Sequence, residues 1–310
     1  MQYIIQARND GVLLRDYLLR TLGLSHRLIT RLKQTPRGIL LNGESVTVRA
    51  VLHQNDVLIL AWEDTSETPH GTIIPSDAWP TVLYEDADIL VCNKPHGMPT
   101  HPSHGHFDDT LANAVAHYEL ATMGHAPVFR SVNRLDRDTS GAVLLARNQL
   151  AAARLSVAMH EGRIHKNYLA LLEGILPQRQ GEIDLPIRRT KESIITREVC
   201  SPDAVGAHAA KTRYAVIASW NVGTYARTLV KAQPLTGRTH QLRVHFAHLG
   251  APIAGDTLYG EHTEGIPTPT RQALHAYSLV FPHPTTGKIV TVVAPLSSDL
   301  RAFLPDHNIT

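Results

Sequence analysis

Residues 133–141, Asn-Arg-Leu-Asp-Arg-Asp-Thr-Ser-Gly, form a dense cluster of charged side chains. The charged members are Arg134, Asp136, Arg137 and Asp138. They lead directly into the apolar segment 142–146, and charges beside a buried strand are costly unless they find partners or a ligand. A turn closed by Gly141 explains the small residues but not the density of charge. Asp136 and Asp138 suggest the carboxylate pair of a glycoside hydrolase, but such close neighbours on one turn rarely flank a sugar bond.

Residues 235–245, Leu-Thr-Gly-Arg-Thr-His-Gln-Leu-Arg-Val-His, form a second polar cluster that is rich in cations. Thr236 and Gly237 predict a turn, and Thr239 is placed to open a helix that ends at Gly250. The apolar face of that helix comprises Leu242, Phe246 and Leu249. Basic groups at a helix start favour an anion, so this segment is a candidate phosphate or carboxylate site.

Several short strands must position these clusters. Strands are expected at 81–84, 89–92, 142–146 and 165–174, with a final hairpin of 278–281 and 288–293 that turns through 284–287. Helices are expected at 150–160 and after a cap at Asp108 and Asp109. Short strands with few helices between them predict an α+β fold with a mixed, largely antiparallel sheet. On such a strand, Tyr168 by itself would usually be a core residue.

Residues 1–62 predict a small separate domain of two helices and a hairpin. The first helix covers 13–22, Ser25 caps a second helix, and Asn42-Gly43 is typical of a tight hairpin turn. The second helix exposes Arg27, Arg31 and Lys33 with no acidic residue nearby. Such a face is either a solvated surface or an RNA contact. The polar, turn-rich residues 63–80 are interpreted as a linker, and 81–310 as the second domain.

Four segments together resemble the RluA-type pseudouridine synthases. Residues 133–141 match the family's H-R-L-D-x-x-T-S-G signature, except that Asn133 stands where the family usually has His. The other matching segments are N-K-P-x-G and H-P-S at 93–103, K-x-Y-x-A-x-x-x-G at 166–174, and G-R-x-H-Q-x-R-x-H at 237–245. The matches keep the family's order between Tyr84 and Val293. Residues 1–62 resemble the alpha-L RNA-binding domain.

The resemblance implies an isomerase that converts uridine to pseudouridine within RNA. It makes Asp136 the catalytic carboxylate, which contacts the ribose either as a nucleophile or as a base. It also implies that Arg243 pairs with Asp136 and that Tyr168 faces the active site, where its ring can stack on the detached base. The target base must leave its stack, and Arg134 is expected to fill the vacated space or grip a flanking phosphate.

The expected partner is structured RNA. The residues expected to contact it are Arg27, Arg31, Lys33, Lys94, Arg134, Lys166, Arg238 and His240. Ribosomal RNA is the first choice because of the additional N-terminal module, and transfer RNA is the second. Two alternatives remain: an RNA-binding assembly factor with an inactive synthase fold, and a hydrolase that would release free uracil. The presence of Asp136, Tyr168 and Arg243 argues against an inactive fold.

Composition sets further limits. A chain of 310 residues with 43% hydrophobic residues can bury the cores of two domains. The net charge of +2 does not by itself indicate nucleic-acid binding. Most basic residues are arginines, which suit phosphate contacts but can also reflect genome composition.

Neither metal nor cofactor is expected, because the isomerisation adds no atoms and transfers no electrons. Two cysteines cannot form a four-cysteine zinc site or a disulfide framework. The spacing of His101, His104 and His106 fits no ordinary zinc pattern and is interpreted as a polar loop near RNA. With no signal peptide and no stretch long enough to span a bilayer, we expect a monomer in the cytoplasm, away from membranes.

Overall fold

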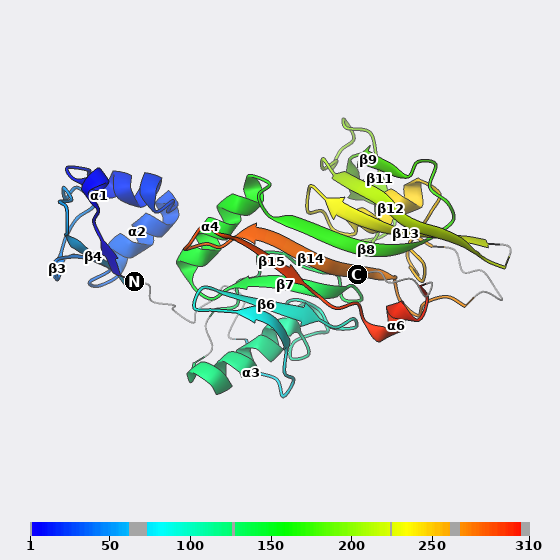
Figure 1. The fold of residues 1–310 in the computed structure, drawn as a ribbon, viewed down its shortest axis with the longest axis horizontal. Coiled ribbons are helices and arrows are strands. Elements are labelled where there is room, and N and C mark those ends of the chain that lie inside the picture. The colour runs from blue at the N-terminus through cyan, green and yellow to red at the C-terminus, as the bar shows by residue number, and fades with distance from the viewer. Residues whose placement is uncertain (1, 62–72, 126–127, 224, 261–266, 305–310) are drawn as a thin grey trace.

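A computed structural model describes residues 2–61, 73–125, 128–223, 225–260 and 267–304. A small N-terminal unit lies beside one end of a long twisted sheet (Figure 1). Of the predicted linker, residues 63–72 lie outside the described part, and 73–80 contain neither helix nor strand. Within the described residues, no helix is long and apolar enough to cross a membrane.

The N-terminal unit is a four-stranded antiparallel sheet, ordered β1-β4-β2-β3, with helices packed on it. Its elements are β1 (Gln2–Ile4), η1 (Ala7–Asn9), α1 (Leu14–Asp16), η2 (Tyr17–Thr21), α2 (His26–Gln34), β2 (Ile39–Leu41), β3 (Glu44–Ser45) and β4 (Val57–Leu60). The predicted first helix is therefore a short α-helix continued by a π-helical turn. Ser25 caps α2 as predicted, since its Oγ accepts the Leu28 N–H at 3.3 Å. Asn42 and Gly43 both have positive φ, as a tight hairpin turn requires.

In the rest of the described chain, nine strands form one sheet, ordered β5-β6-β7-β14-β8-β13-β12-β9, with β15 paired to β14. These strands are β5 (Thr81–Glu85), β6 (Ile89–Lys94), β7 (Ser140–Ala146), β8 (His165–Glu173), β9 (Gln180–Asp184), β12 (Lys211–Val222), β13 (Tyr225–Pro234), β14 (Leu274–Pro282) and β15 (Ile289–Val293). A separate pair consists of β10 (Ile187–Arg189) and β11 (Arg197–Val199). Among the described strands of the large sheet, only β7 and β14 pair in parallel. The predicted α+β class with a mixed, largely antiparallel sheet is confirmed.

Helices cover both faces of this sheet because its central strands are apolar on both sides. In β6, Ile89 and Val91 join the cluster beneath α4 (Gln149–His160), whereas Leu90 and Cys92 join the cluster on the opposite face. This alternation follows from the two-residue period of a strand. The opposite cluster contains side chains of α3 (Leu111–Met123), α5 (Gln241–His248) and α6 (Ser298–Arg301).

Two helix starts differ from the sequence prediction. Helix α3 begins after Thr110, whose backbone N–H donates to Asn113 Oδ1 at 3.1 Å, and not at the two preceding aspartates. Helix α5 begins after His240, which adopts the left-handed conformation, so Thr239 does not cap it. The errors arise because Asp and Thr are both good caps, and the sequence does not show which backbone turn is made.

The parallel junction of β7 with β14 lies at the end of the charged cluster of residues 133–141. Gly141 has φ of +114°, and a Cβ there would collide with the backbone of Ala276. Only glycine therefore permits this close approach. One residue away, Ser140 Oγ lies 2.9 Å from His275 Nδ1, and both side chains are buried. The junction fixes where the charged loop begins relative to β14.

The N-terminal unit contacts the larger one through α4. Leu150 belongs to the same buried apolar cluster as Leu18 and Leu58. Arg154 donates to the carbonyl oxygens of Leu22 at 3.3 Å and Pro284 at 2.9 Å. The helix thus links the small unit to the β14–β15 hairpin.

Candidate active site

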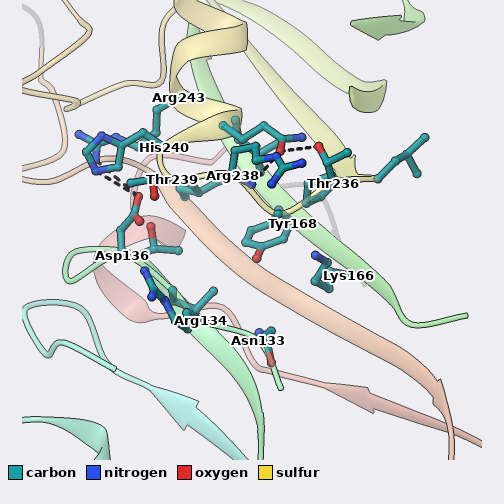
Figure 2. A pocket seen from close by; sticks show the side chains of 18 of the residues that line it. Asn133, Arg134, Asp136, Lys166, Tyr168, Thr236, Arg238, Thr239, His240 and Arg243 are labelled. Carbon is teal, nitrogen blue, oxygen red and sulfur yellow. Dashed lines mark hydrogen bonds and ion pairs between the residues drawn. The ribbon is translucent and has the colours of Figure 1, made fainter. Parts of the chain in front are cut away.

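A cavity of about 540 Å³ opens between the loop before β7, the middle of β8 and the start of α5 (Figure 2). The three predicted catalytic residues, Asp136, Tyr168 and Arg243, all line it. Four residues predicted to contact RNA line it too: Arg134, Lys166, Arg238 and His240. The volume lies within the range of about 300–1,000 Å³ that is usual for ligand pockets. Segments far apart in sequence therefore converge on one site.

Arg243 is shared between two carboxylates. Its Nε and Nη2 donate to Asp256 at 2.6 and 2.7 Å in a buried two-pronged pair, while Nη1 reaches Asp136 Oδ2 at 3.5 Å. Burial lowers the pKa of Arg243, but the hydrogen bonds and charge of Asp256 outweigh burial and raise it. The predicted contact with Asp136 exists, yet the principal partner of Arg243 is Asp256. The fixed guanidinium presents its remaining edge to Asp136.

His240 also faces Asp136, with Nε2 3.9 Å from Oδ2. Its Nδ1 lies 2.8 Å from the hydroxyl of Tyr259, which accepts the backbone N–H of Arg197 at 2.8 Å. The Tyr259 hydroxyl can donate its proton to Nδ1, and in that arrangement the imidazole proton is on Nε2, toward the carboxylate. Burial lowers the pKa of His240, and the charge of Asp136 only partly offsets this. The lowered pKa favours a neutral imidazole beside Asp136, and the RNA contact expected of His240 stays a prediction.

Tyr168 projects from β8 into the cavity and is 7% exposed. Burial raises the pKa of its phenol, and the nearby charge of Asp136 raises it further. The phenol therefore stays protonated at neutral pH. Its ring offers a flat apolar surface, and its hydroxyl can take part in hydrogen bonds but is not a phenolate base.

Side-chain hydrogen bonds of Thr100 and Asn133 hold the loop that carries Asp136. Thr100 Oγ1 donates to the Leu135 carbonyl at 3.0 Å and accepts its N–H at 3.2 Å. Asn133 Nδ2 donates to the Ala142 carbonyl at 3.2 Å, and its Oδ1 accepts the Leu144 N–H at 2.8 Å. Asn133 thus ties the loop to β7, so the family's usual His is not needed for an anchoring contact here.

The structure contradicts the RNA contact predicted for Lys94. It was expected to neutralise an RNA phosphate, but it is fully buried at the end of β6. Its Nζ donates to the carbonyl oxygens of Pro95, Met98 and Arg137 at 2.8, 2.6 and 2.9 Å. Burial lowers the pKa of Lys94 to about 7, against the opposing effect of Asp138 and Asp136. All its donors are used within the protein, so Lys94 supports the loop that carries Asp136 and does not meet a phosphate.

The remaining predicted RNA contacts fall in two places. Arg134 and Arg238 are exposed at the cavity, and Lys166 is half-buried there, where burial lowers its pKa. Arg31 and Lys33 are exposed on α2, far along the molecule from the cavity-lining strands β8 and β13, and the side chain of Arg27 lies outside the described part (Figure 1). The structure therefore does not bring α2 to the cavity.

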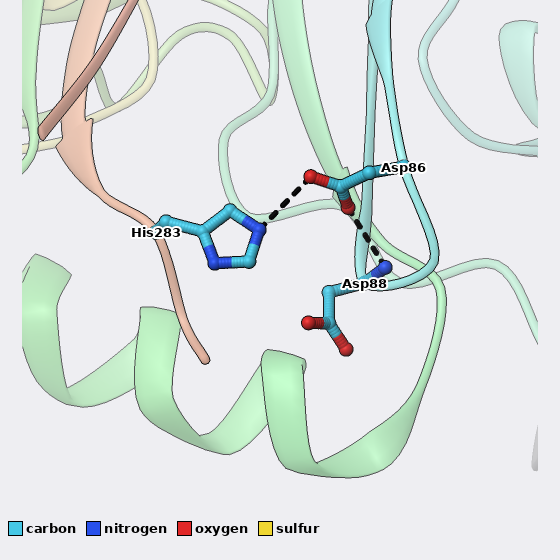
Figure 3. Close-up of side chains that lie close together, drawn as sticks. All are labelled: Asp86, Asp88 and His283. Carbon is cyan, nitrogen blue, oxygen red and sulfur yellow. Dashed lines mark hydrogen bonds and ion pairs between the residues drawn. The ribbon is translucent and has the colours of Figure 1, made fainter. Parts of the chain in front are cut away.

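A group of side chains with metal-ligand chemistry lies elsewhere, where Asp86, Asp88 and His283 meet (Figure 3). His283 Nδ1 accepts the backbone N–H groups of Thr285 and Thr286 at 3.2 and 3.1 Å. Its Nε2 must then carry the proton, which it donates to Asp86 at 2.9 Å.

The imidazole therefore has no lone pair left for a metal. Burial raises the pKa of Asp86, but hydrogen bonds from the Asp88 and Ile89 backbone, and from Tyr84 and His283, lower it on balance. This group joins the β14–β15 turn to the β5–β6 turn. Of the histidines at 101, 104 and 106, His106 pairs with Asp109 at 2.6 Å.

Comparison with known proteins assigns the class. Residues 88–248 match the family model described as RNA pseudouridylate synthase. The chain therefore belongs to the RNA pseudouridylate synthase family, whose members are isomerases acting on RNA. This confirms the predicted family and enzyme class.

Particular relatives cover nearly the whole chain. An uncharacterized RNA pseudouridine synthase of Bacillus subtilis, YjbO, is 39% identical over 290 residues, 93% of this chain and 96% of that protein. Ribosomal large subunit pseudouridine synthase D of Vibrio cholerae is 34% identical over 299 residues, 93% of this chain and 83% of that protein. The solved human RNA pseudouridylate synthase domain containing 1 superimposes with a TM-score of 0.54 at 30% identity, covering 70% of this chain and 83% of that chain.

Sequence reasoning missed the residues that support the site. Asp256 and Tyr259 lie in the segment 255–260, to which the sequence analysis assigned no role, although an acid close in sequence to Arg243 is a usable signal. Thr100 and Arg271 carried no local pattern. Their roles depend on contacts with residues 35 and 133 positions away, respectively.

Proposed function

We propose that this chain isomerises uridine to pseudouridine within structured RNA, with Asp136 as the catalytic carboxylate. The observation that carries the proposal is the position of Asp136 at the cavity wall, facing Arg243 at 3.5 Å and His240 at 3.9 Å. Asp138, two residues away, does not line the cavity and pairs instead with Arg137 at 3.0 Å. One carboxylate with two donors suits chemistry at a single ribose carbon better than a hydrolase's carboxylate pair.

The reaction breaks the bond between the ribose carbon and N1 of uracil, then joins the same carbon to C5 of the rotated base. Asp136 promotes the first step either as the nucleophile that attacks the ribose or as the base that helps to expel uracil. N1 gains a proton and C5 loses one, so the product has the same atoms as the substrate.

Tyr168 holds the detached base by stacking while it turns. Since its phenol stays protonated, Tyr168 does not remove the C5 proton as a phenolate. Arg134 is exposed beside the cavity and fills the space in the RNA that the extruded nucleotide leaves. Extrusion costs a few kcal/mol of lost stacking, which contacts of this kind must offset.

Ribosomal RNA is the proposed substrate, and transfer RNA is the alternative. The similarity to ribosomal large subunit pseudouridine synthases supports this choice. The N-terminal unit supports it as well, if residues 1–62 are an alpha-L RNA-binding domain joined by the linker 63–80 to a catalytic domain of 81–310. In this proposal the protein acts on RNA as a monomer in the cytoplasm.

The test replaces Asp136 with Asn, which keeps the size of the side chain but removes its charge and nucleophile. Asp136→Asn should lower the single-turnover rate by on the order of 10³-fold or more, while RNA affinity stays near normal. Asp138→Asn is the matched control and should retain most of the rate.

Both pseudouridine in the RNA and free uracil are measured in these reactions. Ordinary turnover by Asp136→Asn would remove Asp136 from the mechanism, and stoichiometric release of uracil by the parent enzyme would identify a hydrolase. Mapping pseudouridines in cellular RNA with and without this gene identifies the substrate.

A further inference from the structure

Arg271 is a buried arginine, 6% exposed, that contacts the catalytic loop without lining the cavity. Its Nη1 donates to the Asp138 carbonyl at 2.9 Å, and its Nη2 donates to Ser140 Oγ at 3.2 Å. The neighbouring Gln272 donates through Nε2 to Thr139 Oγ1 at 3.3 Å. Three successive residues, Asp138 to Ser140, are thus held from one point just before β14.

These contacts bear on Asp136 through a single turn of backbone. The Thr139 N–H donates to the Asp136 carbonyl at 3.1 Å, so the segment clasped by Arg271 closes the turn that begins at Asp136. Ser140 is fixed on its other side by His275, whose Nε2 lies 3.1 Å from the Ala294 carbonyl. A shift at Asp138 or Ser140 therefore moves the catalytic carboxylate.

The anchor of Arg271 is near the C-terminal end of the described chain. Asp299 in α6 accepts Nε at 2.8 Å and Nη2 at 3.3 Å, and Ser297 Oγ accepts Nη2 at 3.0 Å. Burial raises the pKa of Asp299, but the hydrogen bond from Arg271 and its other partners lower it to about 2. Asp299 Oδ2 also lies 3.8 Å from His96 Nε2, in the segment after β6.

We propose that Asp299 and Arg271 form a clasp that positions Asp136 for catalysis, a role beyond stabilising the fold. The geometry supports a positioning role because Arg271 uses Nε, Nη1 and Nη2 on three different partners. These partners are Asp299, the Asp138 carbonyl and Ser140 Oγ. A planar fork can span them, whereas a single ammonium cannot. The inference depends on the proposed role of Asp136.

The test compares Arg271→Lys with Arg147→Lys, a matched control at the other end of β7. Arg147 is also largely buried and pairs with Glu119 at 2.9 Å and Glu85 at 2.8 Å. It follows β7, whereas Asp136 precedes this strand. Both substitutions keep the charge and lose the fork, so both should lower the unfolding temperature. Only Arg271→Lys should slow the single-turnover rate on saturating RNA, by about 10- to 100-fold, because small misplacements of a catalytic group are costly.

Two further measurements separate positioning from general loosening. RNA affinity should change by less than about twofold in Arg271→Lys, since the residue meets no RNA. The Thr139 amide should exchange with solvent faster in Arg271→Lys but not in Arg147→Lys. Asp299→Asn keeps one acceptor for Arg271 and should give a smaller rate loss of about threefold to tenfold. It also serves as the test variant if Arg271→Lys does not fold.

An unchanged rate in Arg271→Lys or in a folded Asp299→Asn, alongside a lowered unfolding temperature, would reduce the clasp to ordinary packing. An equal rate loss in Arg147→Lys would have the same meaning. These failures differ from failure of the proposed function, which would appear as normal turnover by Asp136→Asn.

Discussion

At the scale of residues, the site is built on one arginine between two acids that differ in burial. The side chain of Asp256 is fully buried and that of Asp136 is 29% exposed, and Arg243 contacts both. The buried pair fixes the guanidinium plane, so the cavity-lining carboxylate of Asp136 meets a donor whose direction is already set. Preorganised charge of this kind is effective because the protein does not rearrange during the reaction.

Asp256→Asn should therefore weaken both stability and catalysis. The substitution leaves a buried arginine without its counter-charge and points an amide donor at it, which costs about 3–5 kcal/mol of unfolding free energy. The rate on saturating RNA should fall at least tenfold. Denaturant unfolding and single-turnover assays measure the two effects. Glu161→Gln, which breaks an exposed pair with Arg163, should cost less than about 1 kcal/mol and leave the rate unchanged. A fully active Asp256→Asn would mean that Asp136 needs no oriented arginine.

The residues predicted from sequence were those within recognisable motifs. Asp136, Tyr168 and Arg243 do meet in one cavity, as the motifs that carry them predict. Lys94 was assigned wrongly, because the sequence shows a lysine after a buried strand but does not show that its ammonium turns inward to three carbonyls. Arg271 stayed unnoticed for the same reason, since its partners lie far away in the chain.

At the scale of elements, the parallel β7–β14 junction depends on a neutral histidine. His275 accepts from the Ser140 hydroxyl through Nδ1 and donates to the Ala294 carbonyl through Nε2. A second proton on the imidazole would have to bind Nδ1, and the bond from Ser140 would be lost. Burial lowers the pKa of His275 to about 4, below its ordinary value of about 6.5. The junction is also the base of the loop that carries Asp136.

The depressed pKa makes stability depend on pH in a definite direction. Between pH about 6.5 and about 4 the unfolded chain binds the proton and the folded chain does not, so stability is lost as the pH falls. The loss should approach about 3 kcal/mol at the low end. Unfolding free energies across this range should fall more steeply for the parent than for His275→Gln. Equal slopes would mean that other groups account for the acid sensitivity.

Strand and helix positions were predictable where apolar periodicity was strong. The strands near 89–92, 142–146 and 165–174 and the final hairpin all occur, since a buried strand needs a continuous apolar run. The pairing order was not predictable, because β14 enters the sheet between β7 and β8 across more than a hundred residues. The π-helical turn of η2 was missed since it has nearly the same apolar spacing as an α-helix.

At the scale of the whole molecule, the basic face of α2 and the cavity lie on different units. Substrate binding and chemistry should therefore be separable. Arg27→Ala with Arg31→Ala should weaken binding to structured RNA and flatten the salt dependence of affinity by up to about one unit per lost phosphate contact. The rate on saturating RNA should change little.

Binding isotherms at several salt concentrations measure this effect. Arg163→Ala, which removes an exposed arginine after α4, controls for the loss of positive charge. If the double variant and the control share one slope, α2 is a solvated surface and the RNA is held elsewhere.

The clasp between the catalytic loop and the C-terminal part of the chain also orders events in time. The strands within residues 2–61 pair only with one another. In contrast, the loop at Asp138 is held by a hydrogen bond from Arg271, which lies 133 positions later in the chain. Proteins are synthesised from the N-terminus at about 5–20 residues per second, so roughly 10–50 s separate the completion of residue 61 from that of Asp299. The ribosome thus completes the N-terminal unit well before the residues that hold Asp136 in place are synthesised. In the proposed function, the RNA-binding unit is therefore assembled before the catalytic site.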